Sequence, residues 1–397
     1  MMMRFRPLQD LCSTNVERVN PAISPDDEFW YVDISSIDNT AKTIATPTRT
    51  KGKTASVRAR QVIRSRDVLV STTRPNLNSV AQVPHEYSGE ICSTGFCVLR
   101  CGEELDSDYL FHFVRSGYFI DSLSNLVQGA LYPAVTDKQV LAQSIPWLPI
   151  EHQRQIAARL KAQLAEVDKA RRAAEAQLRD AAELHKAIRR TEFEMLLTKW
   201  KRQHCLKDIC AISAGGTPSR GNKSFFEGNI PWVKTLDLNF SVIMDSEEKV
   251  SPEAFRSIRG EMLPVGTVLI AMYGGAGTIG KSGILGIEAC TNQAVCAIQP
   301  VRGTLDSEFL HEWLCCIRSE WMQYSGGNRK DPNINKSIVE MMTIPWPPGN
   351  VQMDFIAKLR EQLSEAIAII DASKFQVSEI DLLPQKILAQ AFDHPES

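Results

Sequence analysis

The chain has 397 residues, of which 45 are Lys or Arg and 47 are Asp or Glu. Charges this evenly balanced exclude a global field that would attract nucleic acid or an anionic membrane, so any polyanion site has to be a local patch. The length and the 43% hydrophobic content predict two or three globular domains. Because no apolar run could span a membrane and no secretory leader is visible, we expect a cytoplasmic protein that does not bind membranes.

Residues 1–149 are typical of a mixed α/β domain. Short β-branched and aromatic runs, such as WYVDI at 30–34 and VLVST at 68–72, predict strands joined by turns rich in Gly, Pro, Ser and Thr. Asp106 precedes an apolar pattern with helical spacing, and its carboxylate can cap that helix.

The ten cysteines are too dilute for a disulfide scaffold, and no two of them form a C-x-x-C pair. The tightest group is Cys92, Cys97 and Cys101, whose spacing fits no common zinc site. We therefore expect buried free thiols in this group, and we assign no metal to the chain.

A basic stretch lies between Asp38 and Asp67, where eight Lys or Arg residues occur without an acidic one. Such a density suits phosphate contacts, whose affinity falls steeply with salt. The alternative is a solvated, partly disordered loop. The eight residues are Lys42, Arg49, Lys51, Lys53, Arg58, Arg60, Arg64 and Arg66.

Residues 150–198 predict one long helix. From Glu151 to Glu194 there is neither Gly nor Pro, and apolar residues recur at gaps near three and four. Roughly 40 helical residues at about 1.5 Å each would extend about 60 Å, and the apolar stripe on so long a helix needs a partner to cover it.

The second half of the chain repeats the first. SIPWLPIEHQRQIAARL at 144–160 returns as TIPWPPGNVQMDFIAKL at 343–359, and LDSDYL at 105 returns as LDSEFL at 305. Self-similarity at a fixed offset indicates a duplicated structural unit. Residues 199–348 are therefore predicted to form a second mixed α/β domain, and 349–397 a second long helix.

Both predicted helices carry an apolar stripe at the same place in the repeat, which favours their pairing as an antiparallel coiled coil. The alternative is that each stripe packs only on its own domain. Pro384 lies near the end of the second helix and should bend or interrupt it. The expected fold class is α/β (α+β), with two similar domains in tandem repeat separated by the two helices.

Gly275, Gly280, Lys281 and Ser282 match the pattern of a phosphate-binding loop. Such a loop needs a helix to begin at the Lys-Ser pair, but glycines follow here, and the first repeat lacks the pattern. We therefore favour a glycine-rich turn between two strands, and a nucleotide-dependent enzyme is the least favoured alternative.

Two related domains joined by a helical spacer are suited to a target with two separated, similar parts. Duplex DNA has this geometry, since a pseudosymmetric reader meets equivalent groove surfaces one or more helical turns apart. The main alternative is a protein-binding scaffold or adaptor built on the coiled coil. Sequence-selective binding of duplex DNA would distinguish the two.

The repeated Ile-Pro-Trp phrase followed by a long helix resembles the specificity subunit of type I restriction-modification enzymes, and the resemblance covers essentially the whole chain. Smaller features agree with it. They are SAGGTPSR at 213–220, IPWVKTLDL at 230–238, VLIAMYGGAGTIGKS at 268–282, TNQAVCAI at 291–298, and the helix ends AIRRTEF and KILAQAF.

The resemblance implies a non-catalytic subunit in which each of two target recognition domains reads one half of a bipartite DNA site, with the helices setting the gap. Similar proteins assemble with two methyltransferase subunits, which use S-adenosylmethionine, and with motor-nuclease subunits, which use ATP and Mg. No cofactor is therefore expected on this chain. Because the two domains differ in sequence, we expect two different half-sites and an asymmetric target.

Two local patterns agree with chemistry carried by partner subunits. Residues 331–334 read Asp-Pro-Asn-Ile and fail the Asp/Asn-Pro-Pro-Phe/Tyr pattern of amino-methyltransferases, and Glu247-x-Lys249 lacks the upstream Pro-Asp of a nuclease. One departure concerns the helix start. The second repeat lacks the Glu-x-Gln phrase of Glu151-x-Gln153, so its docking to a partner is expected to differ.

Candidate DNA contacts are basic and polar side chains in turns near the matched strands. Arg, Lys and Asn can bond to base edges, whereas Ser and Thr mostly position phosphates. For each residue alone the alternative is a surface or turn role. The candidates are Lys51, Lys53, Arg58, Arg60, Ser71, Thr72, Arg74, Asn76, Thr217, Ser219, Arg220, Lys223, Lys234, Tyr273, Arg329 and Lys330. Trp147 and Trp346, flanked by prolines, are expected to anchor the helix starts.

Overall fold

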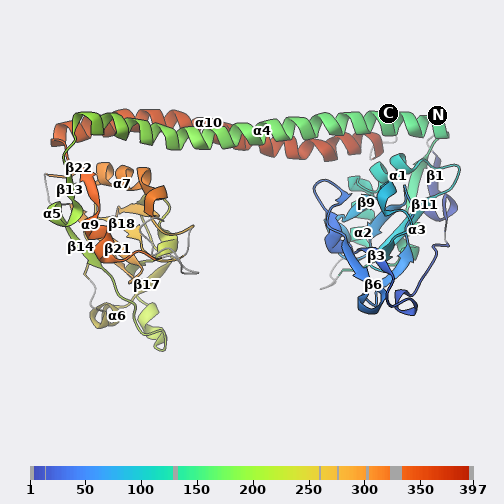
Figure 1. Ribbon diagram of the computed structural model, residues 1–397, viewed down its shortest axis with the longest axis horizontal. Helices are drawn as coiled ribbons and strands as arrows, with labels where there is room; N and C mark the ends of the chain where they lie inside the picture. Colours follow the sequence, from blue (N-terminus) through green and yellow to red (C-terminus); the bar gives the residue numbers. More distant parts are fainter. Residues whose placement is uncertain are drawn as a thin grey trace. The chain divides into compact units, whose positions relative to one another are not determined.

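The computed structural model describes residues 4–13, 15–127, 133–258, 261–274, 277–300, 304–321 and 333–392. Contacts within the chain divide it into unit 1, Met1–Ala176 with Lys374–Ser397, and unit 2, Gln177–Ser373. Each unit contains one α/β domain and a segment of each of two long helices (Figure 1). The boundary between the units therefore falls inside both helices, and each unit draws on both sequence repeats.

The domain of unit 1 is built on two four-stranded sheets. The first has the order β2-β11-β8-β9, formed by Cys12–Ser13, Phe96–Cys101, Val68–Ser71 and Val80–Gln82. The second has the order β6-β3-β10-β7, formed by Thr48–Lys51, Glu28–Val32, Ile91–Ser93 and Ala59–Val62. Alternate residues of β8 enter different cores, Val68 and Val70 on the helix side and Leu69 on the side of the second sheet. Burial on both faces explains why this strand is apolar throughout.

Short elements complete the domain of unit 1. Strand β1 (Arg4–Pro7) pairs with β12 (Ser144–Trp147), and β4 (Ile37–Asp38) pairs with β5 (Thr43–Ile44). The helices are α1 (Ser107–Phe113), α2 (Gly117–Asn125) and α3 (Asp137–Leu141), and 3-10 turns occupy Leu8–Asp10, Pro21–Ile23, Ile34–Ser36, Gly52–Thr54, Pro75–Leu77 and His85–Tyr87. The predicted cap is confirmed, because the Asp106 carboxylate accepts hydrogen bonds from the first backbone N–H groups of α1.

The domain of unit 2 repeats this plan with a five-stranded and a three-stranded sheet. The first has the order β14-β21-β18-β19-β16, formed by Cys210–Ala214, Val295–Pro300, Val268–Ala271, Ser282–Leu285 and Val242–Ile243. The second has the order β17-β15-β20, formed by Glu248–Val250, Ile230–Val233 and Cys290–Thr291. Strand β18 shows the same alternation as β8, with Val268 and Ile270 in one core and Leu269 and Ala271 in the other.

Several of the remaining elements of this domain correspond to elements of unit 1. Strand β13 (Gln203–Cys205) pairs with β22 (Thr343–Pro345). The helices are α5 (Leu206–Ile209), α6 (Pro252–Ser257), α7 (Ser307–Cys316) and α9 (Lys336–Met341), with 3-10 turns at Lys223–Phe226, Thr235–Asp237 and Arg318–Glu320. Asp306 caps α7 as Asp106 caps α1, and its carboxylate accepts the Phe309 N–H at 2.9 Å.

Helices α4 (Ile150–Lys199) and α10 (Gly349–Phe392) are the predicted long helices, and they run antiparallel within each unit. In unit 1 the start of α4 shares a core with the end of α10, where Leu160 and Leu388 are both buried. In unit 2 the end of α4 meets the start of α10, where Glu192 accepts hydrogen bonds from Lys358 at 2.8 and 2.9 Å. Each helix therefore packs against the other in both units, as the coiled-coil prediction requires.

Pro384 does not interrupt α10, and that part of the sequence-based expectation is wrong. The helix continues unbroken from Gly349 to Phe392 with the proline inside it. A proline in a helix removes one backbone hydrogen bond and costs about 3 kcal/mol. Leu388 and Phe392, which follow the proline, are buried in the core of unit 1, and their burial of roughly 1.5–3 kcal/mol each offsets that cost.

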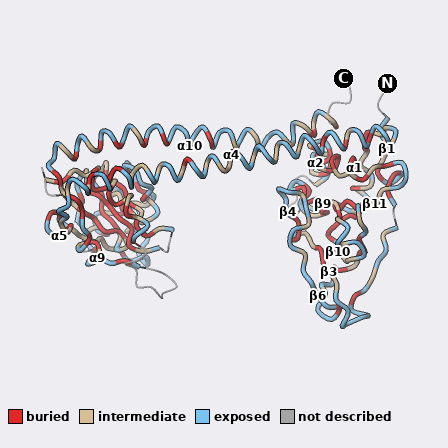
Figure 2. The backbone as a smooth tube through the Cα atoms, turned by 45° about the horizontal axis from the view of Figure 1, so that its top comes forward, coloured by how far each residue is buried: buried red, intermediate tan, exposed pale blue. Residues whose placement is uncertain are grey.

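A phenylalanine at the end of each long helix enters the domain core of its unit. Phe392 of α10 packs against Tyr109 and Phe113 of α1, with ring centroids 5.4 and 5.6 Å apart. Phe193 of α4 packs against Phe309 and Trp313 of α7 at 5.6 and 5.1 Å. Figure 2 shows the buried residues gathered inside the two domains. In each unit, a phenylalanine near the C-terminal end of one long helix therefore completes the core against which the other long helix begins.

The cysteines are free thiols. Cys92 and Cys97 are buried, as expected, and burial raises the pKa of both thiols, whereas Cys101 is partly exposed. Within the described ranges no group of three or more His, Cys, Asp and Glu could hold a metal ion.

Neither α4 nor α10, nor any other helix among the residues described, is apolar enough over a sufficient length to cross a bilayer.

Candidate nucleic-acid interface

Three segments that are distant in sequence meet at one end of the sheets of unit 2. The loop after β14 is tied to β15 by Trp232, whose indole N–H donates to the Gly216 carbonyl at 3.1 Å. The Gly216 N–H in turn donates to the Thr291 carbonyl at 3.0 Å, and the Asn292 N–H donates to Val233 at 3.1 Å. The structure thus brings together the SAGGTPSR, IPWVKTLDL and TNQAVCAI phrases.

Glycine at position 215 makes this approach possible. A Cβ at Gly215 would lie 1.9 Å from the Thr291 carbonyl oxygen, so no other residue fits without moving a backbone. Beside it, the exposed Thr217 hydroxyl bonds to Gln293 of the facing turn. The close packing fixes the loop that carries Thr217, Ser219 and Arg220 at the surface.

Charged side chains are held in a network along this loop. Lys234 contacts Glu247 at 2.9 Å and Glu248 at 2.7 Å, and Arg220 contacts Glu248 at 2.8 Å. Hydrogen bonds from Arg220 and Lys234 hold the pKa of Glu248 below its ordinary value. The Arg220 guanidinium also lies 4.4 Å from the centroid of the Phe226 ring. Arg220 is therefore an exposed but oriented donor, whereas the Lys234 ammonium is mostly enclosed by its two carboxylates.

The corresponding turn of unit 1 joins β10 to β11. The Thr94 N–H donates to the Arg58 carbonyl at 2.9 Å, and the Thr72 N–H donates to Gly95 at 2.8 Å. The exposed side chains around this turn include Arg58 and Arg74. The two units thus place basic residues beside the same turn, but with different side chains.

The remaining predicted contacts of unit 1 are more varied. Asn76 is exposed, and Arg60 is partly buried with its guanidinium donating to the Ala59 carbonyl at 3.0 Å. Lys51 and Lys53 are exposed on β6 and the turn after it, where they pair with Glu28 at 3.5 Å and Asp26 at 3.2 Å. These ion pairs lie at the surface, where such pairs contribute only about 0–1 kcal/mol and exchange readily with other partners.

Several predicted contact residues are not placed for contact with DNA. Ser71 and Thr72 are 3% and 8% exposed, and their hydroxyls donate to the backbone carbonyls of Thr73 and Gly95. Their side chains stabilise the turn after β8, so we correct the prediction for both. Tyr273 is partly buried against the main core of unit 2.

The other predicted contacts of unit 2 divide into two groups. Lys223 and Ser219 are exposed, whereas Arg329 and Lys330 lie outside the described residues.

The basic stretch of residues 38–67 is ordered and largely paired. It contains β5, β6 and β7, so the alternative of a disordered loop is wrong for these residues. Acidic residues from elsewhere in unit 1 reach most of its cations. The pairs are Arg49 with Glu28, Lys51 with Glu28, Lys53 with Asp26, Arg64 with Glu17, and Arg66 with Asp106 and Asp108. Arg58 and Arg60 form no ion pair within the described part of the chain.

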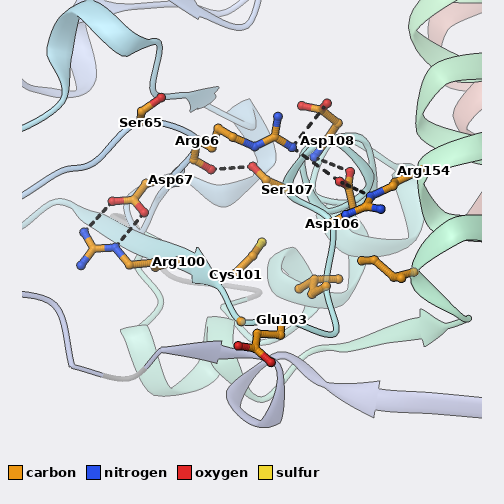
Figure 3. Close-up of a pocket in the computed structure, with 13 residues that line it drawn as sticks. Ser65, Arg66, Asp67, Arg100, Cys101, Glu103, Asp106, Ser107, Asp108 and Arg154 are labelled. Atoms are coloured by element: carbon orange, nitrogen blue, oxygen red, sulfur yellow. Dashed lines mark hydrogen bonds and ion pairs between the residues drawn. The ribbon is translucent and has the colours of Figure 1, made fainter.

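A polar cavity of about 640 Å³ lies where α1 and α4 begin in unit 1 (Figure 3). Arg66 points into it towards Asp106 at 3.5 Å and Asp108 at 3.6 Å, and Asp67 binds Arg100 through both carboxylate oxygens. The Arg66 backbone has φ 70°, and its carbonyl accepts the Ser107 hydroxyl. Because these arginines already pair with carboxylates, we interpret the lining residues as stabilising the contact between the helices and the domain, and not as an anion-binding site.

Strands β18 and β19 are antiparallel, and residues 277–280 between them form a turn, as expected. Ser282 begins β19, and no helix starts at Lys281. Gly275 and Ala276 lie outside the described residues. A strand after the Lys-Ser pair cannot direct a helix N-terminus at a phosphate, so the phosphate-loop alternative is wrong.

The helix starts are anchored as predicted from their tryptophans, and by a residue that sequence reasoning overlooked. Trp147 and Trp346 both pack against the cores of their units, and the Trp346 N–H donates to Thr304 at 2.6 Å. The second repeat lacks the glutamate of the Glu-x-Gln phrase but keeps its glutamine as Gln352. Gln352 and Gln153 are fully buried, and alignment at the offset of 199 residues would have found them.

Comparisons with known proteins find similarity to specificity subunits of type I restriction enzymes. A family model described as the type I restriction modification DNA specificity domain matches residues 198–378. The MjaIX specificity subunit of Methanocaldococcus jannaschii is 28% identical over 150 residues, which are 37% of this chain and 34% of that protein. The chain thus aligns with about a third of that relative's length. The StySPI specificity subunit of Salmonella potsdam is 21% identical over 359 residues, 85% of this chain and 76% of that protein.

Solved structures share the architecture along nearly the full chain. A chain from work on complex assembly and conformational transition of the type I R-M system has a TM-score of 0.83 at 29% identity, covering 98% of this chain and 97% of its own. The HsdS subunit from Thermoanaerobacter tengcongensis has a TM-score of 0.60 at 29% identity, covering 99% and 97%.

Proposed function

Because this chain belongs to the family of type I restriction-modification specificity subunits, we propose that it reads a bipartite, asymmetric DNA site and catalyses no reaction itself. Each domain recognises one half-site, and the paired helices set the number of base pairs between the halves. In unit 1 the contacts come from Arg58, Arg60, Arg74 and Asn76. In unit 2 they come from Thr217, Ser219, Arg220 and Lys223.

One observation supports this proposal above the others. The two domains share their sheets and the turn between β10 and β11 or between β20 and β21, but they present different side chains beside it. A shared frame with different exposed residues is the arrangement needed to read two different sequences at a fixed separation. A scaffold that binds two copies of one protein would instead keep the same surface in both repeats.

The partners follow from the family. We propose that two methyltransferase subunits dock on this chain and methylate adenine with S-adenosylmethionine, and that motor-nuclease subunits, which use ATP and Mg, join the same complex. The chain itself then needs no cofactor. Such a complex works on chromosomal DNA, so we place it in the cytoplasm.

Selection from a random-sequence duplex library tests the proposal. The purified chain, mixed with its methyltransferase subunits, is expected to enrich one split motif with two different halves and a constant gap. Methylation sequencing of the host genome should find the same motif with a modified adenine in each half. No enrichment in the selection, together with no split motif in the genome, would contradict the proposal.

A further inference from the structure

A cavity of about 450 Å³ in unit 2 lies between α4 and the domain, and none of the residues proposed above to contact DNA lines it. Helix α4 contributes His185, Lys186, Arg189 and Arg190, and the domain contributes Phe240 and Arg318. We call this site the junction cavity. Four of the ten residues that line the cavity are Lys or Arg, in a chain whose charges nearly cancel.

Only part of this charge is compensated. Arg189 pairs with Glu312 at 2.5 Å, and Lys186 pairs with Glu183 at 2.7 Å. Arg190 and Arg318 form no ion pair with any residue that the structure describes. The Nε of Arg318 is buried and likewise has no hydrogen-bond partner among those residues. The junction cavity therefore keeps two cations for an anionic ligand.

The Arg318 guanidinium is held in place before any ligand arrives. It donates to the Gly277 carbonyl at 2.9 Å and lies 4.9 Å from the centroid of the Phe240 ring. Phe240 has φ 59°, a left-handed conformation that costs a bulky residue of the order of 1–3 kcal/mol. Its N–H donates to the Ser282 carbonyl at 2.9 Å, which maintains this conformation.

Unit 1 has a related arrangement at the corresponding place. Lys42 has φ 57° just before β5, as Phe240 has just before β16, and the Lys42 ammonium donates to the Asn78 carbonyl at 2.5 Å. Burial, with the neighbouring charge of Arg115, lowers the pKa of Lys42 to about 8, although Asp38 opposes this effect. Burial also lowers the pKa of Arg115 to about 10. The Asn78 side-chain amide in turn donates to the Val114 carbonyl at 2.7 Å, so Lys42 lies near the end of α1, where Arg115 follows. Unit 1 therefore also places two cations close together near β5.

We propose that these two sites, the junction cavity of unit 2 and the Lys42–Arg115 site of unit 1, bind phosphates of the DNA backbone beside the half-sites. The proposal rests on the DNA-reading function proposed above. The Arg318 guanidinium is fixed in orientation and has no carboxylate partner among the described residues, which suits it to phosphate. The two sites share charge but not side chains, since Phe240 and Arg318 stand in one and Lys42 and Arg115 in the other. A ligand recognised by charge alone fits both sites, whereas one protein motif does not.

Equilibrium DNA binding over a salt series tests the proposal in the complex of the full chain with its methyltransferase subunits. Two duplexes of equal length are used, one with the selected site and one without it. The double variant Arg190→Gln/Arg318→Gln is expected to weaken binding of both duplexes by the same factor. The slope of log K against log salt should become shallower by about 2, since each lost phosphate contact removes about 0.9.

Other variants keep the test decisive if the double variant is poorly folded. Arg190→Gln alone and Lys42→Gln alone should each reduce the slope by about 1. The matched control is Arg159→Gln/Arg179→Gln, which removes two exposed α4 charges and should leave the slope unchanged. Melting temperatures of all variants check the fold.

The outcomes separate this inference from the proposed function. If the unmodified complex prefers no sequence, the proposed function fails. If it prefers the site but every junction variant keeps the parent slope, only the phosphate sites are refuted. If a junction variant loses its methyltransferase subunits while the chain keeps its affinity for DNA, the cavity is a protein-docking site and the inference is overturned.

Discussion

Gln153 and Gln352, separated by 199 residues, make the same three hydrogen bonds at the starts of α4 and α10. The side-chain oxygen of Gln153 accepts the Asp106 N–H at 2.9 Å, and that of Gln352 accepts the Asp306 N–H at 2.8 Å. The Gln153 amide donates to the carbonyls of Glu104 and Leu148, and the Gln352 amide donates to those of Thr304 and Pro347. Each glutamine therefore joins a long helix to the capped helix of its domain.

Replacing Gln153 with leucine should destabilise unit 1. The substitution removes the partner of the Asp106 N–H and of two carbonyls in a partly buried site, at about 1–3 kcal/mol for a buried group left unpaired. A clear fall in the urea midpoint of unfolding is expected. Gln163→Leu on an exposed site of the same helix is the control and should unfold near the parent midpoint. Equal midpoints for the two variants would show that the hydrogen bonds do not join helix and domain.

The aromatic ends of the helices should matter as much as the glutamines. Phe193→Ala and Phe392→Ala each empty a site among aromatic rings, and large-to-small changes of this kind cost about 3–5 kcal/mol. Both variants should melt well below the parent protein in calorimetry. Phe375 is 67% exposed on α10, so Phe375→Ala should change the melting temperature little. A large loss in that control would mean that α10 packs differently from this structure.

The duplicated architecture could be predicted because its signals are local. Helix length follows from the absence of Gly and Pro between Glu151 and Glu194, and the domains follow from the repeat. The site was harder to predict. Ser71 and Thr72 stand beside a strand end, but their hydroxyls turn inward to the backbone, which spacing does not show.

The basic stretch shows the same limit for charge. Its cations are compensated by Glu17, Glu28 and Asp106, which come from other segments and are brought near only by the fold. Charge counted along the chain therefore overestimated the patch. Conversely, the junction cavity has no sequence pattern, because it combines α4 with residues between Phe240 and Ser319, which are distant in the sequence.

Stability should fall as the pH drops from 7 towards 4, in part because of His112. This side chain is 5% exposed, and burial, together with the charge of Arg115, lowers its pKa from 6.5 to about 4. Between these values the unfolded chain binds a proton that the folded chain does not, so acid favours unfolding. At pH 5 the loss is about 2 kcal/mol, fully recovered above about pH 7.

Urea unfolding at pH 7 and pH 5 measures this contribution. His112→Leu should reduce the difference between the two midpoints, whereas His85→Leu, at an exposed site, should not. His311, the counterpart of His112 in unit 2, is also buried, and burial lowers its pKa too. The double variant His112→Leu/His311→Leu should therefore show a smaller difference than either single one. An unchanged difference in all three variants would contradict the buried, neutral state of these imidazoles.

The two domains should control the two half-sites independently. Arg58→Gln is expected to relax the preference for one half, and Arg220→Gln for the other, because each guanidinium stands beside the turn of its own unit. A lost contact to a base edge reduces discrimination by about 1–3 kcal/mol, roughly a five- to 150-fold change in preference. Random-sequence selection with the methyltransferase subunits measures both halves in one experiment, with Arg159→Gln on α4 as the control. Changes in both halves from a single substitution would mean that recognition is not divided between the domains.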